Sequence, residues 1–193
     1  FDDFQDGPSA CRPPRWKVYG PAGRAAGGCL ALQPGARMVT GEPKWTDYIL
    51  EGRVMLRGKT GDAGLIFRVN DPGPGLGRMR GYYVGLDTRR LYLARMENNR
   101  QPLAQFDLSR LDCKVQPGVW NLIRVAANGP RIRVWLNRMH PSADPNRGLR
   151  IDLTDESQPL LSGAVGVQAR RVSAWFDNIV VLPTEAPPKP PPQ

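Results

Sequence analysis

The residue types that catalysis requires are sparse in this sequence of 193 residues. Cleavage of a glycosidic bond needs two carboxylates that flank the bond. The carboxylates expected within strands are Glu51, Asp87 and Asp177, and they form no paired motif. The single histidine, His140, lies in a polar turn, where a lone histidine is more often a surface residue than a catalyst. We therefore expect no enzymatic activity, and a glycoside hydrolase or lyase-like activity is the alternative.

Five residues carry the side chains that sugar binding uses. A sugar ring stacks its C–H face on an aromatic ring, and its hydroxyl groups hydrogen-bond to planar polar groups. The candidates, each on a strand face opposite the apolar one, are Arg68, Tyr83, Asp87, Tyr92 and Trp135. We expect exposed aromatic rings on a concave sheet face that binds a glycan. The same residues also fit an ordinary solvated sheet surface, because Tyr and Trp are common in strands.

The elements that must position these side chains are short strands. The chain contains 21 Gly and 20 Pro, and both residue types interrupt helix interiors. No window keeps a helical apolar period for more than two turns. Strand-like runs bounded by turn residues occur at 48–56, 63–69, 82–87, 91–96, 120–126, 131–137, 163–169 and 174–181. Regular strand spacing without intervening helices predicts an antiparallel β-sandwich.

The alternation of apolar and polar residues assigns the faces of these strands. Successive side chains in a strand point to opposite faces, so residues two apart share a face. The positions predicted to face the core are Leu65 and Phe67, then Tyr82, Val84 and Leu86, then Ile132, Val134 and Leu136. Three strands with one consistent apolar face predict a core between two sheets.

The charge balance restricts the partners. Lys and Arg number 27 against 18 Asp and Glu, which gives a formal net charge of +9. The arginines are scattered over loops, as at Arg89-Arg90 and Arg170-Arg171, and form no nucleic-acid-binding motif, so we expect no nucleic acid partner. A basic surface suits anionic glycans, phospholipid headgroups or an acidic protein partner. No run approaches the roughly 18–20 apolar residues of a membrane helix, so we expect no transmembrane segment.

Several short motifs form a recognisable set through their order. They are Phe1-Asp2-Asp3-Phe4, Trp45-Thr46-Asp47-Tyr48, Tyr82-Tyr83-Val84-Gly85-Leu86-Asp87, Gly118-Val119-Trp120-Asn121-Leu122 and Phe176-Asp177-Asn178-Ile179-Val180-Val181. Together they resemble the concanavalin A-like (laminin G-like) jelly-roll domains of bacterial extracellular proteins. Those domains include fructan-binding carbohydrate modules and 3-keto-disaccharide hydrolase-like domains. The resemblance covers residues 1–182 and implies an all-β, two-sheet jelly roll. It also implies a lectin-like binding domain outside the cytoplasm, either periplasmic or secreted.

The resemblance also implies a place for a metal ion. Some similar domains bind a structural calcium where the first and last strands lie side by side, and Asp3 and Asp177 fall at those places. Carboxylate and carbonyl oxygens suit that ion. The alternative is that the two carboxylates cap strand ends or pair with Arg or Lys. We expect no cofactor to be required.

The three cysteines, Cys11, Cys29 and Cys113, lack the paired spacing of a zinc site. Cys11 and Cys29 bracket a segment rich in Gly and Pro. In the extracytoplasmic setting that the resemblance implies, they are expected to close this segment as a disulfide. The alternative is three buried thiols.

The C-terminal composition divides the chain into a sandwich, residues 1–182, and a proline-rich extension, residues 183–193. Six of the last eleven residues are Pro, which favours an extended polyproline II segment over sheet pairing. Such a segment is either a linker or an arm that binds a partner. An arm would make the protein an interaction subunit of a larger envelope or membrane-associated complex, docking through basic loops and the tail. This is the alternative to glycan binding.

Overall fold

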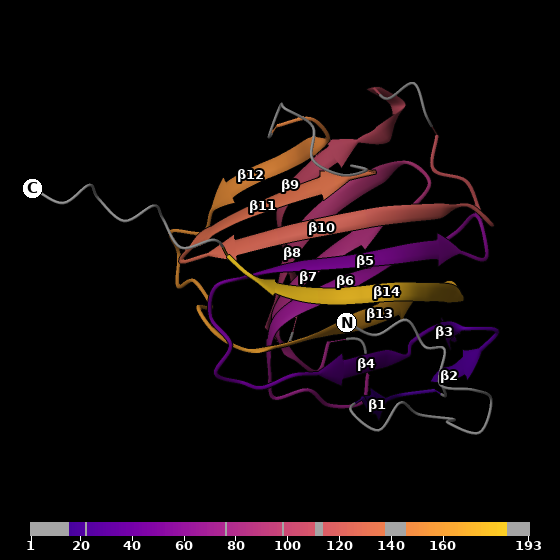
Figure 1. The fold of residues 1–193 in the computed structure, drawn as a ribbon, viewed down its shortest axis with the longest axis horizontal. Coiled ribbons are helices and arrows are strands. Elements are labelled where there is room, and N and C mark those ends of the chain that lie inside the picture. The colour runs from indigo at the N-terminus through magenta and orange to yellow at the C-terminus, as the bar shows by residue number, and fades with distance from the viewer. Residues whose placement is uncertain are drawn as a thin grey trace, which may run out of the picture.

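The computed structural model describes residues 16–21, 23–75, 77–97, 99–110, 114–137 and 146–184. Over these residues the chain is built almost wholly of β-strands (Figure 1). The one helical segment among them is the single 3-10 turn Leu108–Arg110. The predicted all-β architecture is therefore confirmed, and no helix in the described ranges is long and apolar enough to cross a membrane.

Two seven-stranded antiparallel sheets form the two layers seen in Figure 1. Sheet I contains, in spatial order, β1 (Lys17–Tyr19), β4 (Arg37–Thr40), β13 (Ala164–Arg170), β6 (Asp62–Asn70), β7 (Arg80–Leu86), β8 (Arg90–Glu97) and β9 (Asn99–Asp107). Sheet II contains, in spatial order, β12 (Leu149–Thr154), β11 (Arg131–Leu136), β10 (Trp120–Asn128), β5 (Tyr48–Leu56), β14 (Ala174–Pro183), β3 (Cys29–Leu32) and β2 (Gly23–Ala26). Strands β4 and β13 pair in sheet I, and β3 and β14 pair in sheet II. Early and late parts of the chain therefore lie side by side in both layers.

The core lies between the sheets and follows the predicted alternation. The side chains assigned to it from the sequence were Leu65, Phe67, Tyr82, Val84, Leu86, Ile132, Val134 and Leu136, and all eight belong to one buried cluster. Phe67 and Tyr82 stack with their ring centroids 5.2 Å apart. Burial of each large apolar side chain contributes about 1.5–3 kcal/mol, so this face supplies much of the driving force for folding.

A second buried cluster covers the outer face of sheet I. Its members are Val39, Ile66, Val69, Met79, Tyr83, Tyr92, Ala94, Met96 and Ala164. The loop between β6 and β7 is tied to this face by Arg37 of β4, whose buried guanidinium donates to the carbonyl oxygens of Gly73 (3.2 Å) and Arg78 (2.9 Å). The β6–β7 loop therefore covers part of the outer face of sheet I, which is not an open aromatic surface.

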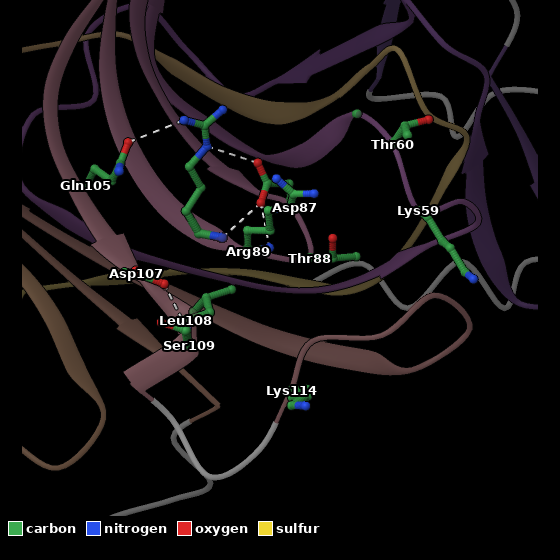
Figure 2. A pocket seen from close by; sticks show the side chains of 12 residues that line it. Lys59, Thr60, Asp87, Thr88, Arg89, Gln105, Asp107, Leu108, Ser109 and Lys114 are labelled. Carbon is green, nitrogen blue, oxygen red and sulfur yellow. Dashed lines mark hydrogen bonds and ion pairs between the residues drawn. The ribbon is translucent and has the colours of Figure 1, made fainter.

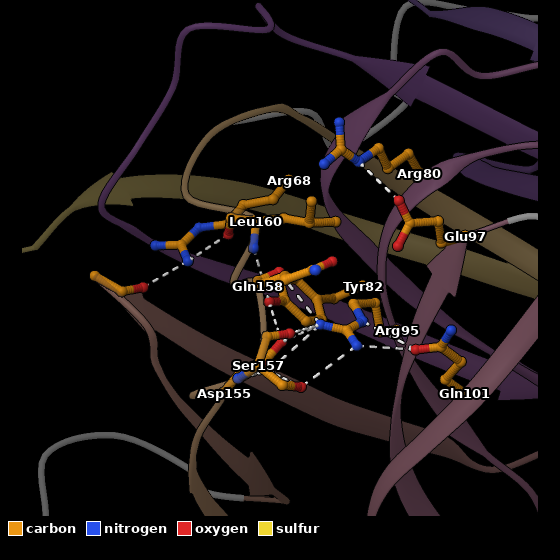
Figure 3. A network of polar contacts seen from close by, with 11 residues as sticks. Arg68, Arg80, Tyr82, Arg95, Glu97, Gln101, Asp155, Ser157, Gln158 and Leu160 are labelled. Atoms are coloured by element: carbon orange, nitrogen blue, oxygen red, sulfur yellow. Dashed lines mark hydrogen bonds and ion pairs between the residues drawn. The ribbon is translucent and has the colours of Figure 1, made fainter.

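A buried polar network joins sheet I to the loop that follows β12 (Figure 3). The hydroxyl of Tyr82 donates to Oδ2 of Asp155 at 2.6 Å and accepts from the backbone N–H of Leu160 at 3.0 Å. Arg95 lies 3.3 Å from the same carboxylate and also donates to the carbonyl oxygen of Ser157. Because each of these buried groups has a partner, the network fixes the loop without an unpaired charge.

Strand β14 ends at Pro183. The predicted proline-rich extension falls mainly on residues 185–193, which lie outside the described residues, as do Asp3 and Cys11.

Candidate functional site

A cavity lies at one end of sheet I, where three loops meet (Figure 2). Its volume is about 700 Å³, which is within the usual range for small-ligand sites. The lining residues are Lys59, Thr60, Gly61, Asp87, Thr88, Arg89, Arg90, Gln105, Asp107, Leu108, Ser109 and Lys114. They come from the β5–β6 loop, the β7–β8 turn with the start of β8, the end of β9, the 3-10 turn and the segment before β10, which contributes Lys114. Ten of these twelve residues have polar or charged side chains, and none of the twelve is aromatic.

Asp87 organises one wall of this cavity. Its Oδ1 accepts the backbone N–H groups of Arg89 (2.7 Å) and Arg90 (2.8 Å), which fixes the tight turn between β7 and β8. Its Oδ2 accepts from Nε of Arg90 at 3.1 Å, and Arg90 also reaches Oε1 of Gln105 at 3.4 Å (Figure 2). The predicted site residue Asp87 thus lies in the cavity, where it orients neighbouring polar groups.

The opposite wall is held by Asp107. Its Oδ1 accepts the backbone N–H of Ser109 at 2.9 Å and so starts the 3-10 turn. This backbone hydrogen bond holds the pKa of Asp107 below its ordinary value, so the carboxylate is ionised at neutral pH. The N–H of Leu108 donates to the carbonyl oxygen of Arg89 at 2.8 Å, which joins the two walls. The cavity is therefore built by hydrogen bonds between the loops that line it.

A second cavity of about 410 Å³ adjoins the first on the outer face of sheet I. The two share Thr60, Gly61, Asp87 and Arg90. The second cavity adds Asp62, Arg100, Arg170 and Arg171. These residues come from the ends of β6, β9 and β13, so the topology of sheet I brings them together from distant parts of the sequence. We call the two adjoining cavities the end site.

Tyr83 and Tyr92 lie beneath the end site, but their rings are not available for stacking. They are only 0% and 5% exposed, so the expectation of exposed rings is wrong. Both hydroxyls donate to Oδ1 of Asp62 at 2.6 Å, and the two rings pack edge to face. Burial raises the pKa of each hydroxyl, and the nearby Asp62 carboxylate raises it further. The two tyrosines therefore remain neutral and position Asp62.

A glycine explains why Tyr92 lies flat against the sheet. Gly85 is directly opposite Tyr92 in the β7–β8 pair. A Cβ at position 85 would lie 2.4 Å from Cζ of Tyr92, so any larger residue would displace the ring. A glycine that pairs with an aromatic residue of the neighbouring strand is a sequence signal for a ring that lies over the sheet. The alternation of apolar and polar residues does not contain this signal.

Arg68 is a structural residue and does not reach the end site. The register of β6 shifts after Phe67, and Arg68 itself has a φ of 50°, so the strand alternation fails at this bulge. Its guanidinium is fully buried and donates to the carbonyl oxygens of Gly129 (2.6 Å) and Leu160 (2.8 Å). The expectation that Arg68 faces a ligand is therefore wrong, because its two terminal nitrogens join loops inside the protein.

Trp135 is also remote from the end site, since it belongs to β11 of sheet II. The residue is only 4% exposed, and the guanidinium carbons of Arg124 and Arg133 lie 5.9 and 5.3 Å from the centroid of its ring. Such contacts stabilise the outer face of sheet II through cation–π attraction. The predicted ring platform at Trp135 is thus covered by arginine side chains.

The described residues do not assemble a calcium site around Asp177. Its two oxygens accept from the backbone N–H (2.7 Å) and the Nδ2 (3.3 Å) of Asn178, and Asp177 lies at a register shift inside β14 rather than at a strand end. Among the residues that the structure describes, no three His, Cys, Asp or Glu side chains are grouped as metal ligands. The other expected ligand, Asp3, lies outside those residues, so calcium binding stays a prediction.

Cys29 has a free thiol in the structure, so the predicted disulfide is not found. Burial raises the pKa of this thiol, and the negative charge of Asp177 raises it further. Its expected partner, Cys11, lies outside the described residues.

Sequence comparison agrees with the fold. The model of the family described as 3-keto-alpha-glucoside-1,2-lyase-like domain matches residues 6–182. No curated protein matches the sequence.

Three solved structures illustrate the structural similarity. The carbohydrate-binding module CBM66 from Bacillus subtilis has a TM-score of 0.68 at 16% identity, over 86% of this chain and 94% of that chain. A putative glycosyl hydrolase from Parabacteroides distasonis ATCC 8503 has a TM-score of 0.58 at 15% identity, over 88% of each chain. The exoplasmic/lumenal domain of VIP36, in a Ca²⁺/Man3GlcNAc-bound form, has a TM-score of 0.66 at 12% identity, over 92% of this chain and 86% of that chain. At these identities the similarity concerns the fold, and it confirms the predicted jelly-roll sandwich.

Proposed function

Since the chain belongs to the 3-keto-alpha-glucoside-1,2-lyase-like domain family, we propose that it is a lectin-like module that binds a saccharide in the end site without cleaving it. One observation carries this proposal. The larger cavity of the end site is lined by polar side chains that already hydrogen-bond to one another. Arg90 donates to Asp87 and to Gln105.

The lining suits hydroxyl groups. A carboxylate accepts hydrogen bonds, a guanidinium donates them, and an amide or hydroxyl does both. Asp87, Arg90, Gln105 and Ser109 together offer each of these types in one cavity. Because the turn hydrogen bonds fix Asp87 and Asp107 before a ligand arrives, binding costs little side-chain ordering there. The absence of an aromatic ring from the lining means that recognition relies on hydrogen bonds rather than stacking.

The neighbouring structures support a saccharide as the ligand class. CBM66 is a carbohydrate-binding module, and the VIP36 domain holds a mannose-containing glycan. That VIP36 domain is exoplasmic or lumenal, which also supports our proposal that this chain acts outside the cytoplasm, in the periplasm or after secretion.

We propose binding without catalysis because the carboxylates of the end site already have partners. Asp87 holds a turn and an ion pair, Asp107 holds the 3-10 turn, and Asp62 accepts from two tyrosines. A general acid or base needs a carboxyl group within reach of the substrate proton. Incubation with 3-keto-glucosides and aryl glycosides is expected to give no product. Turnover that is lost in Asp62→Asn or Asp87→Asn would refute this part of the proposal.

Binding itself is tested by calorimetry against a panel of neutral and acidic oligosaccharides. We expect Gln105→Ala and Lys114→Ala to weaken binding, because both side chains line the cavity and neither belongs to the core. Gln116→Ala is the matched control, since Gln116 is exposed and does not line the end site. Absence of binding to every saccharide, or equal loss in the control, would contradict the proposed site.

A further inference from the structure

The smaller cavity of the end site carries more positive charge than its own residues neutralise. Four arginines line it, Arg90, Arg100, Arg170 and Arg171, against two carboxylates, Asp62 and Asp87. Only Arg90 has an ion-pair partner there, through Asp87 at 3.1 Å. In the part of the chain that the structure describes, no ion pair involves the side chain of Arg100, Arg170 or Arg171.

Among the described residues, Asp62 forms no ion pair with any of these arginines. It lies directly opposite Arg170 in the β13–β6 pair, but its Oδ1 accepts from two tyrosine hydroxyls. The half-buried Arg170 retains a buried Nε without a hydrogen-bond acceptor among the described residues. The positive charge of Arg170 also acts on Arg37. Burial lowers the pKa of Arg37 to about 10, and repulsion from Arg170 is the second cause of this lowering.

The arrangement also holds the guanidinium groups in place. The guanidinium carbons of Arg90 and Arg100 lie 5.9 and 5.1 Å from the centroid of the Tyr92 ring. Cation–π contact with a buried ring restricts these long side chains before a ligand binds. Arg100, which this contact restrains and which has no carboxylate partner among the described residues, is well suited to hold a planar or tetrahedral anion through paired N–H donors.

Building on the proposed saccharide function, we infer that Arg100, Arg170 and Arg171 bind a negatively charged substituent of the saccharide, a carboxylate or a sulfate group. The remainder of the sugar would occupy the adjoining larger cavity, because the two cavities share four lining residues. The expected ligand class is therefore an acidic saccharide.

Matched ligand pairs test this inference. Trigalacturonate is compared by calorimetry with its fully methyl-esterified form, and a sulfated galactan oligosaccharide with its desulfated form. We expect at least one acidic member to bind about tenfold or more tightly than its neutral counterpart, because charge-assisted hydrogen bonds are the stronger kind. The acidic member that does so identifies the group. Binding should weaken at high salt, since these arginines are partly exposed.

Arg100→Gln and Arg170→Gln should each reduce the preference for the acidic member about tenfold. Arg100 is exposed, so its variant keeps the fold even if the half-buried Arg170 proves necessary for stability. Arg53→Gln, an exposed site on sheet II, is the control with the same change of charge and should leave the preference intact.

Three outcomes would overturn the inference. Equal binding of acidic and neutral partners would refute it while leaving the proposed saccharide function in place. A preference that persists in both arginine variants would refute the assignment to this cavity. Failure of every saccharide to bind would refute the proposed function and the inference together.

Discussion

The hydroxyl of Tyr92 donates to Oδ1 of Asp62 at 2.6 Å, so a ring buried on β8 holds a carboxylate at the start of β6. Tyr83 donates to the same oxygen at the same distance. Asp62 and the two tyrosine rings therefore lie at the boundary between the buried cluster on the outer face of sheet I and the end site. The carboxylate is thereby oriented by side chains that a ligand does not need to displace.

Tyr92→Phe keeps the ring and removes one of these two donors. We expect a loss of about 1.5 kcal/mol in the free energy of unfolding, the usual contribution of a hydrogen bond to a charged group. Urea unfolding measures this change. Tyr19→Phe is the control, because no hydrogen bond of the Tyr19 hydroxyl is among those described, and its effect should stay within about 0.5 kcal/mol. Equal stability of Tyr92→Phe and the wild type would contradict the role assigned to this bond.

Gly85→Ala should be destabilising because its Cβ would lie 2.4 Å from Cζ of Tyr92. Overpacking of this kind costs about 1–3 kcal/mol. In a Tyr92→Ala background the same change should cost less, because the clashing ring is gone. A double-mutant cycle measures this difference, and we expect a coupling of about 1–2 kcal/mol. Additive effects would show that the ring does not depend on the glycine.

Arg68→Met should cost about 3–5 kcal/mol, since it leaves the buried carbonyl oxygen of Leu160 and the half-buried one of Gly129 without their donor. Arg68→Lys should restore only part of this loss, because an ammonium group lacks the planar fork of donors that joins several acceptors. Urea unfolding measures both variants, with Arg133→Met on the outer face of sheet II as the control. A wild-type midpoint for Arg68→Met would contradict the structural role of this arginine.

Alkaline pH should destabilise the protein through its buried tyrosines. Burial, with the nearby Asp155 carboxylate, raises the pKa of Tyr82 to about 12, and burial raises those of Tyr48, Tyr83 and Tyr92 as well. The unfolded chain releases these protons near pH 10, whereas the folded chain retains them. The stabilisation is therefore complete below about pH 10 and is lost as the pH rises towards 12.

The urea midpoint, measured from pH 8 upwards, should fall steeply above about pH 10. Each tyrosine contributes up to about 1.4 kcal/mol per pH unit in that window. Tyr48→Phe should reduce the slope of stability against pH by the contribution of one proton. This change separates the tyrosines from other groups that titrate at high pH. An unchanged slope in this variant would contradict the raised pKa of Tyr48.

The fold could be predicted from the sequence because it depends on alternation, and the alternation is regular along β7, β11 and the part of β6 that precedes Arg68. Leu65, Val84 and Val134 were thus placed in the core correctly. The site could be predicted only in part. Asp87 was predicted as a candidate and lines the cavity, but its position there depends on a turn that the alternation places only approximately.

Other candidates were placed wrongly, and some residues of the end site were missed, for physical reasons. Alternation assumes an unbroken strand, and the bulge at Arg68 turns that side chain into the loops. Alternation also assigns a face without showing what covers it, so Tyr92 was taken as exposed. Asp62 and Arg170 lie opposite each other only because β6 pairs with β13, a long-range pairing that no local pattern in the sequence shows.

The central claim is that a saccharide binds in the end site of sheet I. Amide chemical shifts, followed by NMR during titration with the tightest-binding oligosaccharide, test this claim most directly. The account predicts saturable shifts at Thr60, Asp87, Arg90 and Gln105, with little change at Arg133 and Trp135 on sheet II. Shifts concentrated around Trp135, with the end site unaffected, would contradict it.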